Sequence, residues 1–220
     1  MKFQAIIFDM DGTIVNTEHL WKQASHMIIA NRGYVLCPQE EHILAQKLPG
    51  GGLRNSCQLI KDMIKTDDSV EMLMKEKQEI ACQLYGTGVC FINGFPEFHQ
   101  KVVARNLKTA IATNANKQTI ELTNKSLSLG NYFGDHIYTI NHVNNIGKPN
   151  PAIYVYAAQQ LGISPAECIA IEDSAHGIAA AQAAGMFCIG INSSGKPEQI
   201  EAADLKIESY QDINLDLLLE

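Results

Sequence analysis

The chain has 220 residues, 46% of them hydrophobic, which is enough apolar material for one substantial core or for a core with a smaller satellite. A net charge of −7 without any basic run argues against nucleic acid as a partner. No apolar stretch approaches the roughly 18 residues that span a membrane, and the first apolar run is too short for a signal peptide, so we expect a cytoplasmic protein.

The first predicted element is a strand over residues 3–8, because five of these six residues are apolar. Such a run is typical of a parallel strand that is covered on both faces. It stops at Asp9, and Asp11 follows in a turn that contains Gly12. Two carboxylates this close repel each other, and a hard divalent cation such as Mg²⁺ relieves the repulsion. Taken alone, the pair could also be a solvated Asp-Gly turn.

Residues 17–86 contain no convincing strand. The apolar residues here recur at helical spacing, which predicts helices. Two helices have start signals at Thr17 and Pro38, and another has a capping-box pattern at Asp68 and Glu71. The expected helices cover about 17–31, 38–47, 53–64 and 68–86, with a glycine-rich break at 48–52. A helical block between two strands indicates an inserted cap domain, which we place at 16–89, leaving 1–15 and 90–220 for the main domain.

From about residue 94 the chain alternates between helices and strands. We expect helices over 95–105, 117–127, 151–161 and 174–184, strands over 108–112, 136–140, 168–171 and 186–191, and a weak helix-strand-helix tail. This alternation predicts an α/β fold with a doubly wound, Rossmann-like parallel sheet. The six cysteines are scattered without a CxxC pair, so we expect buried thiols rather than disulfides or a zinc site. We also expect the protein to be a monomer.

Polar clusters follow three of the predicted strands, and a lysine-proline pair precedes a helix. The clusters begin at Asp9, Thr113 and Glu172, and the pair is Lys148 with Pro149. Each could be a cap, a turn or a surface lysine on its own. Because parallel sheets bind ligands at the carboxyl ends of their strands, the pattern instead brings four carboxylates, a hydroxyl and a lysine to one edge.

This combination fits the transfer of a phosphoryl group. Asp9 can act as a covalent nucleophile, and Asp11 can protonate the leaving oxygen and later activate water. Mg²⁺ held by Asp9, Asp11 and Asp173 would screen the anionic nucleophile from the anionic phosphate. Side chains and backbone amides would hold the phosphate oxygens, and the expected phosphate-binding residues are Gly12, Thr113, Asn114 and Lys148.

The sequence resembles the haloacid dehalogenase superfamily, in its phosphatase and beta-phosphoglucomutase-like branch with a helical cap. The resemblance covers essentially the whole chain, and its four motifs occur in order: Asp9-Met10-Asp11-Gly12-Thr13, then Thr113, then Lys148-Pro149, then Glu172-Asp173-Ser174. It implies that Asp9 is the nucleophile, Asp11 the acid and base, Asp173 a metal ligand and Glu172 a supporting carboxylate at the metal site.

The predicted cap departs from the family in one place and carries two candidates for substrate recognition. Relatives usually have Asp where this chain has Asn16, which removes a negative charge near the hinge. Arg54 matches an arginine that holds a second phosphate in mutase-like relatives, and Lys47 lies on the other side of the glycine-rich break. An arginine in the first turn of a helix is, however, often simply solvated.

We therefore expect a Mg²⁺-dependent phosphatase that acts on a small phosphorylated metabolite such as a sugar phosphate. The alternative is a hexose phosphomutase of the beta-phosphoglucomutase type, but those relatives carry a histidine where this chain has Trp21. Dehalogenase relatives lack the aspartate found here as Asp11, and a phosphonate hydrolase needs a Schiff-base lysine in the cap. A non-enzymatic binding module would be expected to have lost Asp9 or Lys148.

Overall fold

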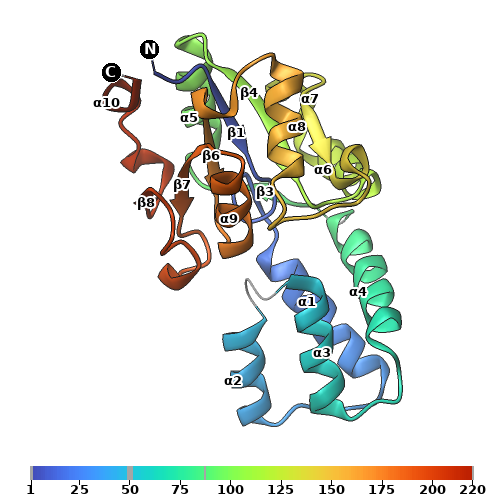
Figure 1. The fold of residues 1–220 in the computed structure, drawn as a ribbon. Coiled ribbons are helices and arrows are strands. Elements are labelled where there is room, and N and C mark those ends of the chain that lie inside the picture. Colours follow the sequence, from blue (N-terminus) through green and yellow to red (C-terminus); the bar gives the residue numbers. More distant parts are fainter. Residues whose placement is uncertain (1, 49–51, 87, 220) are drawn as a thin grey trace. The chain divides into compact units, whose positions relative to one another are not determined.

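The computed structural model describes residues 2–48, 52–86 and 88–219 (Figure 1). The chain forms two compact units, one of Met1–Asn16 with Val89–Glu220 and the other of Thr17–Gly88. In the described part of the chain, no helix is long and apolar enough to cross a membrane.

A six-stranded parallel sheet forms the centre of the first unit, in the order β5-β4-β1-β6-β7-β8 (Figure 1). Its strands are β1 (Ala5–Phe8), β4 (Lys108–Thr113), β5 (Ile137–Thr139), β6 (Cys168–Glu172), β7 (Phe187–Ile191) and β8 (Leu205–Ile207). The strand predicted over residues 3–8 is confirmed for Ala5–Phe8, and these four residues are buried, as expected for a central parallel strand, whereas Gln4 is exposed. The α/β fold class is confirmed.

Two separate apolar clusters cover the two faces of this sheet. Alternate residues of β1 enter different clusters, with Ile6 and Phe8 on one face and Ala5 and Ile7 on the other. The first cluster includes residues of α5 (Phe95–Ala104), α6 (Lys117–Leu127), α7 (Gly130–Phe133) and α10 (Leu215–Leu219). The second includes residues of α8 (Ala152–Leu161) and α9 (Ala175–Ala183). The sheet is therefore wound on both sides.

Two details of the first unit differ from expectation. Helix α8 begins at Ala152, so Pro151 is its cap rather than its first residue, and the Asn150 side chain accepts a hydrogen bond from the amide of Ala152. A two-stranded antiparallel ribbon, β2 (Val15–Asn16) with β3 (Cys90–Phe91), was not anticipated. Strands of two residues carry too little pattern to be read from sequence. Asn16 lies in this ribbon, opposite Cys90.

The second unit is helical, as predicted, with α1 (Glu18–Asn31), α2 (Pro38–Lys47), α3 (Gly52–Ile64) and α4 (Val70–Tyr85). Helix α4 packs against α1 and α3. The expected capping box at Asp68 is wrong, because Ser69 caps α4 by accepting from the amide of Met72. The Asp68 carboxylate instead accepts two hydrogen bonds from Arg32. Part of the glycine-rich break, residues 49–51, lies outside the described residues.

Candidate active site

The first carboxylate of the site follows directly from the strand β1. The β1 and β6 strands pair in parallel with Phe8 opposite Ile171, and the amide of Asp9 continues the ladder to the carbonyl of Ile171 at 3.0 Å. Asp9 therefore leaves the sheet beside Glu172, which ends β6. The neighbouring position of these strands is what brings together residues 163 positions apart.

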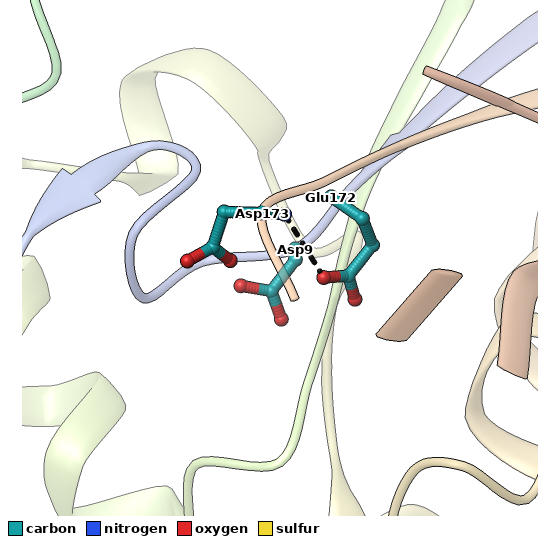
Figure 2. Close-up of side chains that lie close together, drawn as sticks. All are labelled: Asp9, Glu172 and Asp173. Carbon is teal, nitrogen blue, oxygen red and sulfur yellow. Dashed lines mark hydrogen bonds between the residues drawn. The ribbon is translucent and has the colours of Figure 1, made fainter. Parts of the chain in front are cut away.

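Asp9, Glu172 and Asp173 place carboxylate oxygens within 4.8 Å of one another (Figure 2). Asp9 and Glu172 are buried and Asp173 is partly buried. Among the residues that the structure describes, these three form the group of acidic side chains able to hold a metal ion, and the carboxylate of Asp11 is not part of it. The expected role of Asp11 at the metal would have to come from its backbone carbonyl.

The electrostatics of this group favour a cation. Burial raises the pKa of Asp9 well above its usual range; the charge of Lys148 opposes this rise, and those of Glu172 and Asp173 add to it. Burial, followed by the charge of Glu172, likewise raises the pKa of Asp173. Carboxylates that resist ionisation in isolation become charged when a cation offsets their repulsion. The all-oxygen donor set suits Mg²⁺.

Lys148 is the positive charge of the site, and only 4% of its side chain is exposed. Its Nζ lies 2.5 Å from Oδ1 of Asp9 and 2.6 Å from Oε1 of Glu172. Burial lowers the pKa of Lys148, but the charges of these two carboxylates more than offset that effect and raise the pKa overall. Lys148 is therefore protonated at neutral pH and bridges the end of β1 to the end of β6.

Glu172 is fully buried, and each of its oxygens accepts two hydrogen bonds. Oε1 accepts hydrogen bonds from Nζ of Lys148 and, at 2.7 Å, from the hydroxyl of Tyr154. Oε2 receives the amide of Asp173, drawn as the dashed line in Figure 2, and the hydroxyl of Ser174, both at 3.2 Å. A carboxylate with this many donors is firmly oriented.

Thr113 and Asn114 shape the loop after β4. The Thr113 hydroxyl is buried and accepts a hydrogen bond from the amide of Ala115 at 3.0 Å. The Asn114 side chain accepts from the backbone amide of Lys148 at 3.0 Å, so it holds the loop that carries the lysine. The sequence predicted both residues at this edge but did not predict the contact between Asn114 and Lys148.

Gly12 has a positive φ of 86°, which favours glycine. A Cβ atom there would lie 2.1 Å from Oδ2 of Asp173, so only glycine allows this loop to approach the carboxylate. The Gly12 amide donates to the carbonyl of Val15 at 2.8 Å. Phosphate binding at Gly12 stays a prediction.

The two recognition candidates in the helical unit are exposed. Arg54 pairs with Glu71 at 2.9 Å, and both side chains are about two-thirds exposed, at 63% and 66%. Lys47 is the last residue of α2 and is exposed. An ion pair this exposed is screened by solvent and contributes little to stability, so the Arg54 guanidinium can readily exchange Glu71 for another anion.

Three further contacts near the site were also missed from the sequence. Tyr154 reaches Glu172 from α8, the hydroxyl of Thr13 donates to Oδ1 of Asp173 at 3.3 Å, and Tyr210 donates to the carbonyl of Thr13 at 2.9 Å. Thr13 lies inside the first motif, so its proximity to the site could have been inferred. The two tyrosines carry no local signal that distinguishes them from core residues.

The chain has a doubly wound parallel sheet that carries buried acidic groups and a lysine at its carboxyl edge. This arrangement is typical of α/β enzymes that act on anionic substrates. A family model described as haloacid dehalogenase-like hydrolase matches residues 6–191. The chain belongs to this family and is an enzyme of its phosphatase and beta-phosphoglucomutase-like branch.

Three relatives illustrate the similarity. The chain is 28% identical over 183 residues to the phosphorylated carbohydrates phosphatase of Thermotoga maritima, covering 83% of this chain and 82% of that protein. It is 45% identical over 74 residues to beta-phosphoglucomutase of Bacillus subtilis, covering 34% of this chain and 31% of that protein. A crystal structure of a Deinococcus radiodurans HAD family hydrolase with bound phosphate and sodium superposes with a TM-score of 0.76 at 27% identity, covering 99% of this chain and 96% of that one.

Proposed function

We propose that this enzyme is a Mg²⁺-dependent phosphatase that hydrolyses a small phosphorylated metabolite through an aspartyl-phosphate. The observation that carries the proposal is the position of the Asp9 carboxylate. It lies within hydrogen-bond distance of Lys148 and within 4.8 Å of the Asp173 carboxylate oxygens. A nucleophile placed between a fixed cation and a metal-binding carboxylate suits attack on an anionic phosphorus.

Asp9 and Asp173 are the carboxylates best suited to hold the metal, together with the backbone carbonyl of Asp11. Both oxygens of Glu172 already accept hydrogen bonds, so we assign Glu172 the role of orienting its neighbours rather than binding the metal directly. Bound Mg²⁺ supplies positive charge that offsets repulsion between the nucleophile and the phosphate. Lys148 supplies a second positive charge for the phosphate oxygens, and Thr113 and Asn114 fix the loops around it.

The proposed reaction has two steps. In the first, an oxygen of Asp9 forms a bond to phosphorus while the bond to the leaving oxygen breaks, and Asp11 gives that oxygen a proton. In the second, Asp11 takes a proton from water, the water oxygen bonds to phosphorus, and the bond to Asp9 breaks. Asp9 returns to a free carboxylate and inorganic phosphate is released.

The substrate class we infer is a phosphorylated sugar or a similar small metabolite. The relative from Thermotoga maritima is named for phosphorylated carbohydrates. Lys47 and Arg54 are the proposed recognition residues of the helical unit, since each offers an exposed positive charge. We further propose that the protein acts as a cytoplasmic monomer without a nucleic-acid or membrane partner.

A hexose phosphomutase is the second candidate, because the local identity to beta-phosphoglucomutase is high over 74 residues. Trp21 opposes this reading, since mutase relatives carry histidine there. The Trp21 ring packs against Tyr85 within the helical unit, with centroids 6.5 Å apart, which is a packing role.

The test is phosphate release from a panel of phosphorylated metabolites, with Mg²⁺ and with EDTA. We expect release from one or more sugar phosphates with Mg²⁺ only. Reduction of the quenched enzyme with borohydride should convert a phosphorylated Asp9 to homoserine, detectable by peptide mass spectrometry. Conversion of beta-glucose 1-phosphate to glucose 6-phosphate without phosphate release would favour the mutase. No turnover of any phosphate ester would refute both.

A further inference from the structure

Tyr154 is a fully buried tyrosine that the proposed reaction leaves without a role. Its hydroxyl donates a hydrogen bond to Oε1 of Glu172 at 2.7 Å. Lys148 Nζ lies over its ring, 4.8 Å from the ring centroid. One side chain of α8 thus contacts both members of the Lys148–Glu172 ion pair, through two different parts of its structure.

The hydroxyl of Tyr154 acts only as a donor here. Burial raises the pKa of Tyr154 well above its usual range, and the charge of Glu172 raises it further, so the proton stays on the phenol. Oε1 of Glu172 consequently accepts from two donors at similar distances, Tyr154 at 2.7 Å and Lys148 at 2.6 Å. The tyrosine and the lysine therefore share one acceptor oxygen of Glu172.

This shared oxygen matters because Lys148 is itself shared between two carboxylates. Nζ is 2.5 Å from Asp9 and 2.6 Å from Glu172. A fully buried carboxylate attracts an ammonium group strongly, and a second donor on the same oxygen reduces that attraction. The ring adds a cation–π contact on another side of the ammonium group. Both effects keep the charge of Lys148 available on the side of Asp9, where a phosphate would bind.

We propose that Tyr154 is a positioning residue that holds the Lys148 ammonium between Glu172 and Asp9 and so sets the affinity of the site for a phosphoryl group. The inference rests on the proposed function for the identity of the bound group. Its physical basis is the pair of contacts from one buried ring, to a carboxylate and to the ammonium that this carboxylate binds.

The test compares Tyr154→Phe, which removes the hydroxyl and keeps the ring, with Tyr156→Phe as a matched control. Tyr156 is on the same helix and packs against Tyr138 and His142 instead. Calorimetric titration with inorganic phosphate and Mg²⁺ should show about three- to tenfold weaker binding for Tyr154→Phe, corresponding to loss of one hydrogen bond. The Tyr156→Phe affinity should equal that of the wild type. Circular dichroism checks that both variants fold.

A second arm separates positioning from a merely structural role. If Tyr154 acts through the lysine, adding Tyr154→Phe to Lys148→Ala should cause no further loss of phosphate affinity. An additive loss in the double variant would overturn the proposal, as would wild-type phosphate affinity in Tyr154→Phe alone.

The phosphate titration also distinguishes failure of this inference from failure of the proposed function. A wild-type enzyme that binds phosphate but hydrolyses no ester would refute the phosphatase, while the variants would still decide the role of Tyr154. A hydrolytically active wild type whose phosphate affinity does not change in Tyr154→Phe would refute the inference alone. Absence of any phosphate binding to the wild type with Mg²⁺ would overturn the inference, whereas the phosphatase is decided by turnover of the ester panel.

Discussion

The hydroxyl of Tyr210 donates a hydrogen bond of 2.9 Å to the carbonyl oxygen of Thr13, 197 residues earlier in the chain. Tyr210 is 2% exposed, and its ring packs against Phe95 and Phe98. Thr13 in turn donates to Oδ1 of Asp173. The C-terminal segment, which lies beyond the residues that the family model matches, thereby holds the loop that contains Asp11 and Gly12.

Tyr210→Phe should therefore reduce both stability and activity. Loss of a buried hydrogen bond that leaves the Thr13 carbonyl unpaired costs about 1–3 kcal/mol. Because Thr13 belongs to the loop that carries Asp11, the proposed acid and base, we also expect kcat on p-nitrophenyl phosphate to fall several-fold. Urea unfolding and steady-state kinetics measure the two effects. Tyr132→Phe is the control, since Tyr132 packs on the same Phe95 ring. Equal changes in both variants would contradict a specific role for the Tyr210 hydroxyl.

Asp9→Asn should abolish turnover while the protein remains folded. The amide has nearly the shape of the carboxylate but is a far poorer nucleophile, so the rate should fall by orders of magnitude. Stability should not decrease strongly, because burial already penalises the charge of Asp9. Single-turnover phosphate release and thermal unfolding test this expectation. Comparable rates in the Asn variant would exclude covalent catalysis by Asp9.

Mg²⁺ should activate the enzyme, and Ca²⁺ should inhibit it. Ca²⁺ takes more ligands at longer distances than Mg²⁺, so it would displace Asp9 from its position relative to the phosphorus. Activity titrations with each metal after treatment with EDTA measure this effect, and Mn²⁺, which also prefers oxygen ligands, serves as a comparison. Full activity in EDTA or with Ca²⁺ alone would show that the acidic group does not act through Mg²⁺.

The sequence was sufficient to predict the sheet and the edge where the site lies. The apolar runs before Asp9 and Glu172 mark buried parallel strands, and strands that run parallel must end at one edge. It was not sufficient for contacts that depend on side-chain packing between distant segments, such as that of Tyr210 with Thr13. The cap of α4 shows the same limit, since Asp68 and Ser69 are both good capping residues and only the contact of Asp68 with Arg32 decides between them.

His99 should make the stability of the fold depend on pH. It is 4% exposed and hydrogen-bonds to the hydroxyl of Thr109, and burial lowers its pKa to about 4. Histidine in the unfolded chain has a pKa of about 6.5 and so binds a proton more tightly than His99 does in the fold. The contribution of His99 to the stability of the fold is therefore fully present above pH 6.5 and is lost as the pH falls toward 4. The free energy of unfolding that protonation of His99 removes over this pH range is roughly 2–4 kcal/mol.

Urea unfolding at several pH values between 7.5 and 4.5 tests the role of His99. His99→Gln keeps a hydrogen-bonding side chain but cannot be protonated in this range, so its stability should vary less steeply with pH than that of the wild type. Differences between the two proteins are the relevant quantity, because the buried carboxylates also contribute. Identical slopes for both proteins would assign the pH dependence to other groups.

Arg54→Ala should raise KM for substrates with a second anionic group and leave p-nitrophenyl phosphate nearly unaffected. We expect residues at the sheet edge to hold the transferred phosphoryl group and the helical unit to bind the rest of the substrate. Loss of a charge-assisted contact costs about 1.5–3 kcal/mol, or roughly ten- to a hundredfold in KM. Because Glu71 pairs with Arg54, Glu71→Gln should have the opposite, smaller effect by releasing the guanidinium. Equal losses on both substrates would indicate a structural role for Arg54, and no change on any metabolite would place substrate recognition elsewhere in the helical unit.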